Sequence, residues 1–153
     1  MSDAVLSHIR WLTRRDLPAV LEIERQGFAH PWDEADFIGR LRDRCCIGLV
    51  LEVDSQIFGF MIYELHAGFF AVLNMAIATD YRRHGLGSRM IDKLKLKLEP
   101  QQRTQIRTRV SEANVDAQVF LRANRFKVAG VDRSGGEGRY LYDFVFDGSK
   151  THD

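Results

Sequence analysis

The 153-residue sequence predicts a single α/β domain, of the α+β kind, with a mixed and mostly antiparallel central sheet. About six to seven strands and about four helices are expected, because strand-like and helix-like segments follow one another along the whole chain. Hydrophobic residues make up 45% of the sequence, which is enough for a packed core. The length fits one domain, expected over residues 1–147, followed by a flexible tail at 148–153.

The N-terminal part is expected to form a short strand and two helices. The strand is predicted around residues 9–11. Asp16 is a typical capping residue, and apolar residues at helical spacing then run over 17–26. Pro31 ends this pattern, and Asp33 is a suitable cap for a second helix.

The other strands are predicted, in chain order, at 45–53, 57–65, 69–78, 104–110, 126–131 and 139–146. Short polar linkers predict that the first two and the last two form hairpins. The glycine cluster at 135–138 is therefore interpreted as a hairpin turn rather than as a phosphate site. The nearly continuous apolar run at 69–78 is typical of a strand that is buried on both faces.

Two more helices are predicted between these strands. One starts at about Gly87, places Met90 and Leu94 on one face, and ends before Pro100. The other covers 115–124 after Asn114, which can cap it.

The segment Arg82-Arg83-His84-Gly85-Leu86-Gly87-Ser88 lies between a buried strand and a helix, which is the layout of an anion site. The first turn of a helix carries unpaired N–H groups, and glycines allow positive φ and close approach of ligand oxygens. The spacing is neither that of a P-loop nor that of the dinucleotide fingerprint. An ordinary tight turn between strand and helix is the alternative.

Composition excludes several classes of partner. The net charge of +1 provides no electrostatic reason to expect nucleic acid, and no apolar run is long enough to span a membrane. Cys45 and Cys46 are adjacent and lack the spacing of a metal site, so no metal is expected. A reducing, cytoplasmic location fits these features. The oligomeric state, monomer or dimer, is left open.

The pattern [R/Q]-x-x-G-x-[G/A] after a long apolar strand resembles the pyrophosphate loop of the GCN5-related N-acetyltransferases, the GNAT superfamily. Three segments, "FAHPWDEADF", "LNMAIATDYRRHGLGSRMI" and "ANVDAQVFLRANRF", are similar to those of the bacterial ribosomal-protein alanine N-acetyltransferases. The resemblance implies the GNAT fold, with a sheet splayed at the site of acetyl-CoA, the acetyl donor.

The resemblance also implies roles for particular residues. The strand backbone that would face the pantetheine arm belongs to Met75, Ala76 and Ile77. The pyrophosphate would lie among Arg82, Arg83, His84, Gly85, Leu86, Gly87 and Ser88. Asn114 would contact the cofactor, or serve only as a helix cap; His84 is interpreted as a solvated loop residue. The acceptor channel would be flanked by Phe28, Pro31 and Trp32, whose alternative is a buried aromatic loop.

Catalysis is where the sequence departs from the resembled enzymes. In those enzymes a glutamate acts as the base and a tyrosine acts as the acid. The matching positions hold Arg109 and Leu121, and neither of these residues can move the proton. The candidate replacements are Glu112 and Glu64 as bases, with His66 beside Glu64, and Tyr140 or Tyr142 as acids. Each of them is also a plausible surface or core residue.

The missing base favours an acceptor amine of low pKa. An α-amine, with a pKa of about 7.7–8.0, is roughly a tenth to a fifth neutral at pH 7, whereas a lysine is neutral about once in 2,500. Arg107 and Arg109 share strand parity, and on the acceptor side they would favour anionic acceptors. A solvated strand face is the alternative.

The sequence thus predicts transfer of an acetyl group from acetyl-CoA to a primary amine, such as a protein N-terminal α-amine. The rivals are a non-catalytic acyl-CoA-binding module and a small-molecule amine acetyltransferase. A ribosome- or RNA-associated module would need a contiguous basic face, which the near-neutral charge does not suggest.

Overall fold

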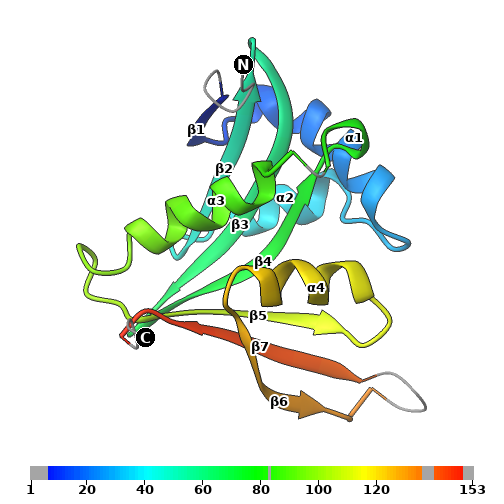
Figure 1. Cartoon of the computed structure of the whole chain (residues 1–153). Helices are drawn as coiled ribbons and strands as arrows, with labels where there is room; N and C mark the ends of the chain where they lie inside the picture. Colours follow the sequence, from blue (N-terminus) through cyan, green and yellow to red (C-terminus); the bar gives the residue numbers. More distant parts are fainter. Residues whose placement is uncertain (1–6, 83, 136–139, 150–153) are drawn as a thin grey trace.

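The computed structural model describes residues 7–82, 84–135 and 140–149. Within them, one seven-stranded sheet has the order β1-β2-β3-β4-β5-β7-β6, and β4 and β5 form its parallel pair (Figure 1). The strands are β1 (Ser7–Trp11), β2 (Cys46–Val53), β3 (Gln56–His66), β4 (Phe69–Ile77), β5 (Gln105–Ser111), β6 (Lys127–Asp132) and β7 (Leu141–Asp147). The predicted mixed, mostly antiparallel sheet is confirmed.

In the described part of the chain, four α-helices flank the sheet: α1 (Leu17–Gly27), α2 (Glu34–Leu41), α3 (Leu86–Leu96) and α4 (Val115–Ala123). Helices α1 and α2 pack with β2, β3 and β4 around a core that includes Val20, Phe37 and Phe60. A second core, on the other face, joins α3 and α4 to the sheet. Within the described residues, no helix has the length and apolarity needed to cross a membrane.

The predicted hairpins are present, and Asp33 caps α2 as predicted. Asp16 lies at the N-cap of α1, but its side chain makes no capping hydrogen bond there. Asp54 and Ser55 form the β2–β3 turn with positive φ angles. Asp33 accepts a hydrogen bond from Asp36 N–H at 2.8 Å, as an N-cap does. Residues 136–139 of the second hairpin turn lie outside the described residues, and β7 begins at Leu141 rather than at 139.

The chain after β7 is described as far as Ser149. Gly148 N–H donates to Thr104 O at 2.7 Å, so the backbone is still held where the predicted tail begins. Residues 150–153 lie outside the described part, and the flexible tail stays a prediction for them.

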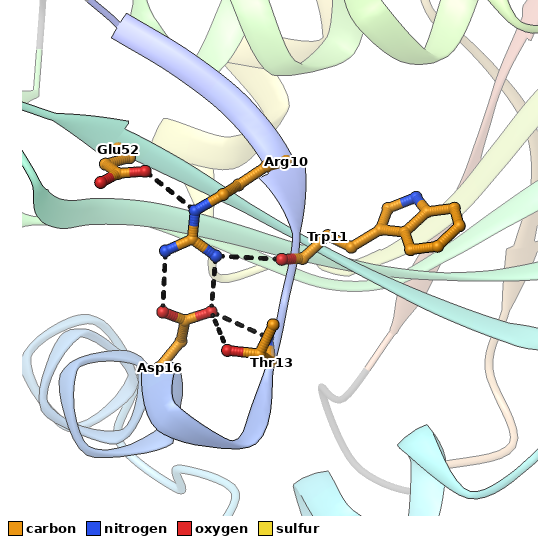
Figure 2. Close-up of polar contacts among 5 residues, drawn as sticks. All are labelled: Arg10, Trp11, Thr13, Asp16 and Glu52. Carbon is orange, nitrogen blue, oxygen red and sulfur yellow. Dashed lines mark hydrogen bonds and ion pairs between the residues drawn. The ribbon is translucent and has the colours of Figure 1, made fainter.

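An ion-pair network ties β1 to the start of α1 (Figure 2). The two terminal nitrogens of Arg10 donate to the two oxygens of Asp16 at 2.8 and 2.9 Å, and its Nε donates to Glu52 at 2.8 Å. Asp16 also accepts from the backbone and the hydroxyl of Thr13. The Arg10 guanidinium, more than any other group, lowers the pKa of Asp16 from 3.8 to about 2.

We expect Asp16→Asn to lower the free energy of unfolding at pH 7 by at most about 2 kcal/mol. Because the pKa of Asp16 is lowered on folding, this stabilisation is present above pH 4 and is lost as the pH falls towards 2. Urea unfolding of both proteins at several pH values measures it. The same substitution at the exposed Asp92 is the control. A difference that stays constant from pH 7 to pH 2 would contradict the assignment.

Candidate active site

The parallel pairing of β4 with β5 ends half-way along both strands. It runs from Phe69 opposite Gln105 to Val72 opposite Thr108, where the Thr108 hydroxyl donates to Val72 O at 3.0 Å. Beyond this point β4 pairs with β3 and β5 pairs with β7, and the two strands diverge (Figure 1). The sheet is therefore splayed, as the resemblance implied.

A bulge in β4 marks the start of the splay. Ile62 of β3 lies opposite Asn74, and Tyr63 lies opposite Val72, so Leu73 is an extra residue. The bulge changes the parity of the strand: Val72 and Met75 both face the α3 side, whereas Leu73 packs with the α1 side. From Leu73 to Ile77, no strand among the described residues pairs with the β5-facing edge of β4. Its backbone groups can bind a ligand.

Helix α3 begins next to this free edge. Its N-cap is Gly85, in the left-handed region with φ 76°. Arg89 N–H makes a helical bond back to Gly85 O, so the N–H groups of Leu86, Gly87 and Ser88 lack partners within the helix. Together with the helix dipole, these groups form an anion site.

The two glycines of the motif serve different ends. Around Gly85 there is space for a Cβ, and its positive φ is what requires glycine. A Cβ on Gly87 would lie 3.0 Å from the ring of Phe120, on α4. The small size of Gly87 therefore also permits close packing of α3 on α4, and the close approach of ligand oxygens to Gly87 stays a prediction.

The other predicted pyrophosphate residues make these contacts. Arg82 Nε donates to Ile77 O at 3.1 Å. The exposed His84 ring lies 6.3 Å from that of Tyr81. Ser88 accepts from the Asn124 side chain at 3.2 Å. Arg83 lies outside the described residues.

Asn114 is the N-cap of α4. Its side-chain oxygen accepts from Ala117 N–H at 3.1 Å, which confirms the helix-cap interpretation. The helix starts directly after the C-terminal end of β5, so Asn114 stands at the mouth of the splay. A contact with acetyl-CoA stays a prediction.

The loop between α1 and α2 lies on the other face of the sheet. Trp32 packs edge-on against Phe37 at 5.1 Å between ring centroids, and Phe37 packs against Phe60 of β3. Phe28 is half-buried and Pro31 is exposed. The sequence did not identify one residue of this region: the buried Glu24 on α1, which accepts from Trp32 N–H at 2.8 Å.

Arg107 and Arg109 project from the same side of β5, because both are exposed while Ile106 and Val110 are buried. Arg107 stacks on the ring of Phe69, 3.8 Å from its centroid. Both side chains lie on the α1 side of the sheet, where the resemblance places the acceptor.

Two carboxylates hold the side chain of Arg109. Asp143, its cross-strand neighbour on β7, accepts from Nε at 2.8 Å, and Asp132 on β6 accepts from Nη1 at 3.2 Å. The bond with Asp143 contributes most to raising the pKa of Arg109 above its usual value. The charge of Arg109 is thus more than balanced locally.

The candidate proton carriers fall into two groups. Glu112 N–H donates to Tyr140 O at 2.9 Å, so these residues adjoin at the mouth of the splay, and the Arg133 guanidinium lies 5.4 Å from the Tyr140 ring. Tyr142 packs against the α3-side core. Glu64 lies two strands away, on β3, hydrogen-bonded to His66 at 2.7 Å.

Sequence reasoning found no metal ligand set, but strand pairing brings one possible group together. Asp43, Cys46 and Glu64 have ligand atoms within 4.8 Å of one another. Burial contributes most to raising the pKa of the Cys46 thiol, and the charges of Asp43 and Glu64 contribute less. The Cys46 Sγ lies 3.9 Å from Glu64 Oε2. An apolar cleft of about 380 Å³, lined in part by Cys46, opens between β1 and α2 and does not reach the splay.

A family model described as the acetyltransferase (GNAT) domain matches residues 44–128, more than half of the chain. The chain belongs to the GNAT acetyltransferase family. The [ribosomal protein bS18]-alanine N-acetyltransferases of Salmonella typhimurium and Escherichia coli K12 are 28% and 26% identical to it over 129 residues. These alignments cover 84% of this GNAT chain and 86% of each relative.

Solved structures agree on the fold. The crystal structure of the ribosomal-protein-S18-alanine N-acetyltransferase from Escherichia coli has a TM-score of 0.83 at 22% identity, covering 96% of this chain and 97% of that one. Arabidopsis thaliana Naa50, in complex with the bisubstrate analogue CoA-Ac-MVNAL, has a TM-score of 0.77 at 13% identity, covering 93% and 99%.

The residues present fit acetyl-CoA, the co-substrate of this family. A pyrophosphate needs several N–H donors, and the first turn of α3 supplies them beside a left-handed glycine. A pantetheine arm carries amides, and the free edge of β4 offers backbone partners for them.

We expect Gly85→Ala to weaken acetyl-CoA binding at least about tenfold, because an alanine resists the left-handed φ and shifts the donors of the first turn. Gly68→Ala is the matched control, since Gly68 also has a positive φ and open space but lies in the β3–β4 turn. Calorimetry on the folded variants measures both. Equal affinities for acetyl-CoA would mean that the pyrophosphate binds elsewhere.

Proposed function

We propose that this protein transfers the acetyl group of acetyl-CoA to a primary amine, and that its acceptor is the N-terminal α-amine of a protein. The observation that carries the proposal is the splayed sheet with a free β4 edge beside the left-handed N-cap of α3. The named activities of the bacterial relatives support a protein N-terminus as acceptor.

The chain's own groups would act by binding and positioning. The amides of Leu86, Gly87 and Ser88 would bind the pyrophosphate, and the free β4 edge would hold the pantetheine arm. Acetyl-CoA supplies the activated acetyl thioester. An α-amine entering between the α1–α2 loop and β5 would meet this edge from the other face of the sheet.

We further propose that other residues replace the usual base and acid in this chain. At the corresponding positions, Arg109 is held by two carboxylates, and Leu121 is 5% exposed within the core. Glu112 and Tyr140, adjoining at the mouth of the splay, are the proposed alternatives, with Glu64 more distant. An α-amine suits such a site, because its low pKa leaves a useful neutral fraction at pH 7.

A non-catalytic acyl-CoA-binding module is the second candidate. The same replacements at Arg109 and Leu121 favour it, since they remove the proton carriers but leave the cofactor site intact. A small-molecule amine as acceptor is a variant of the first proposal. We place the reaction in the cytoplasm, without nucleic acid or membrane as partner.

If an α-amine reacts without a dedicated strong base, kcat/KM for an acceptor peptide should rise up to about pH 8, following deprotonation of the amine. Glu112→Gln should then lower the rate by less than the roughly 10²–10⁴-fold expected for an essential base. Thiol release measured with a panel of N-terminal peptides tests both points. Cofactor binding with no amine-stimulated release would favour the binding module.

We expect Arg107, rather than Arg109, to attract acidic acceptors, because Asp132 and Asp143 balance the charge of Arg109. Arg107→Gln should lower the preference for peptides with an early Asp or Glu by about threefold at low salt, and Arg109→Gln should lower it less. Competition assays between acidic and basic peptides measure the preference. A larger effect at Arg109 would restore that residue as the acceptor contact.

A further inference from the structure

Glu24 is a buried carboxylate to which the proposed chemistry gives no part. It lies on the inner face of α1 and is 2% exposed. A buried carboxylate is costly unless hydrogen-bond donors surround it. Its neighbours on the same helix, Glu22 and Arg25, are exposed and pair with each other instead.

The two oxygens of Glu24 join two segments that border the proposed acceptor channel. Oε2 accepts from Trp32 N–H at 2.8 Å, in the loop between α1 and α2. Oε1 accepts from Asn74 Nδ2 at 2.9 Å, on the residue directly after the Leu73 bulge. An ionised carboxylate accepts only, so the amide nitrogen of Asn74 must face it.

The contact with Trp32 is to the backbone, so it fixes the path of the loop rather than the indole. The indole is placed by Phe37, which belongs to α2. The loop therefore has one anchor on α2 through aromatic packing and another on α1 and β4 through Glu24. Because Asn74 is part of the strand that begins to diverge from β5, the second anchor relates the loop to the splay itself.

We propose that Glu24 is a positioning residue for acceptor binding: its two hydrogen bonds hold the α1–α2 loop at a fixed place relative to the β4 bulge. This inference deepens the proposed function and rests on it. Glu24 need not touch the acceptor, since it acts through Trp32 and Asn74.

The negative charge of this contact can be moved from position 24 to position 74 by exchanging acid and amide side chains. Asn74→Asp puts two carboxylates together, which repel. In the Glu24→Gln single variant, the oxygen of the new side-chain amide can accept from Trp32, and its NH₂ can donate to an Asn74 amide that has turned over. In the double variant, the same NH₂ donates to the new carboxylate, so one negative charge and both bonds are restored.

A double-mutant cycle compares four proteins: the unchanged pair, Glu24→Gln, Asn74→Asp and the double variant. All four carry Trp11→Phe, which leaves Trp32 as the remaining tryptophan of the two. Trp32 emission, kcat and KM for an N-terminal acceptor peptide, calorimetric acetyl-CoA affinity and Tm are measured for each. Glu22→Gln, on the exposed face of the same helix, is the matched control.

Asn74→Asp should raise the acceptor KM about tenfold and shift Trp32 emission, while acetyl-CoA affinity changes less than about threefold. Adding Glu24→Gln should return both KM and emission towards wild type. Should the Asn74→Asp protein not fold, Asn74→Ala, which removes one bond without repulsion, should raise KM about threefold.

The proposal is overturned if Asn74→Asp and Asn74→Ala leave KM and emission unchanged, or if the double variant is no better than Asn74→Asp. It is also overturned if the variants change Tm and acetyl-CoA affinity but not the acceptor KM, because that is a structural role alone. If the wild type acetylates no peptide, the proposed function fails, and acceptor positioning fails with it. Emission would then still show whether Glu24 fixes the loop.

Discussion

The end of β4–β5 pairing at Val72 and Thr108 is the constraint on which the rest of the structure depends. A strand inside a sheet normally has both edges bonded, and an unbonded buried edge is costly. Here the Leu73 bulge turns β4 aside while β3 still holds its other edge. Strand β5 meanwhile keeps its pairing with β7. The splay thus follows from the pairing of the chain's own strands, which leaves one edge of β4 without a strand partner.

The helices are arranged around this opening according to the parity of β4. The bulge lets Val72 and Met75 face the α3 core and lets Leu73 and Ala76 face the α1 core. Both faces of the strand are therefore covered, although the strand itself has lost a neighbour. As a result the α3 N-terminus and the α1–α2 loop border the same opening from opposite faces, which suits a reaction between two ligands.

Sequence reasoning predicted the features that local patterns specify. Gly85 at a helix start, Asn114 as a cap, and the shared side of Arg107 and Arg109 each depend on a few adjacent residues. It could not predict the partners of Arg109, because Asp143 comes opposite it only through the β5–β7 register. The same holds for Glu24 and Asn74, fifty positions apart, and for Cys46 and Glu64. Glu24 lies within the helix predicted over 17–26, but the pattern did not show which donors would satisfy it.

Under the proposal that Arg109 replaces a catalytic base, these registers would account for acetyl transfer without a base on β5. A cation at position 109 would repel a protonated amine if it stood alone, but Asp132 and Asp143 leave the three-residue group with a net negative charge. The local field therefore does not oppose an approaching amine. With an acceptor of low pKa the proton costs about 1 kcal/mol at pH 7, so holding the amine in place matters more than removing its proton. Under the same proposal, residues that fix geometry would take over the importance that proton carriers have elsewhere. These residues are Thr108, where the β4–β5 pairing ends, and Glu24 behind the α1–α2 loop.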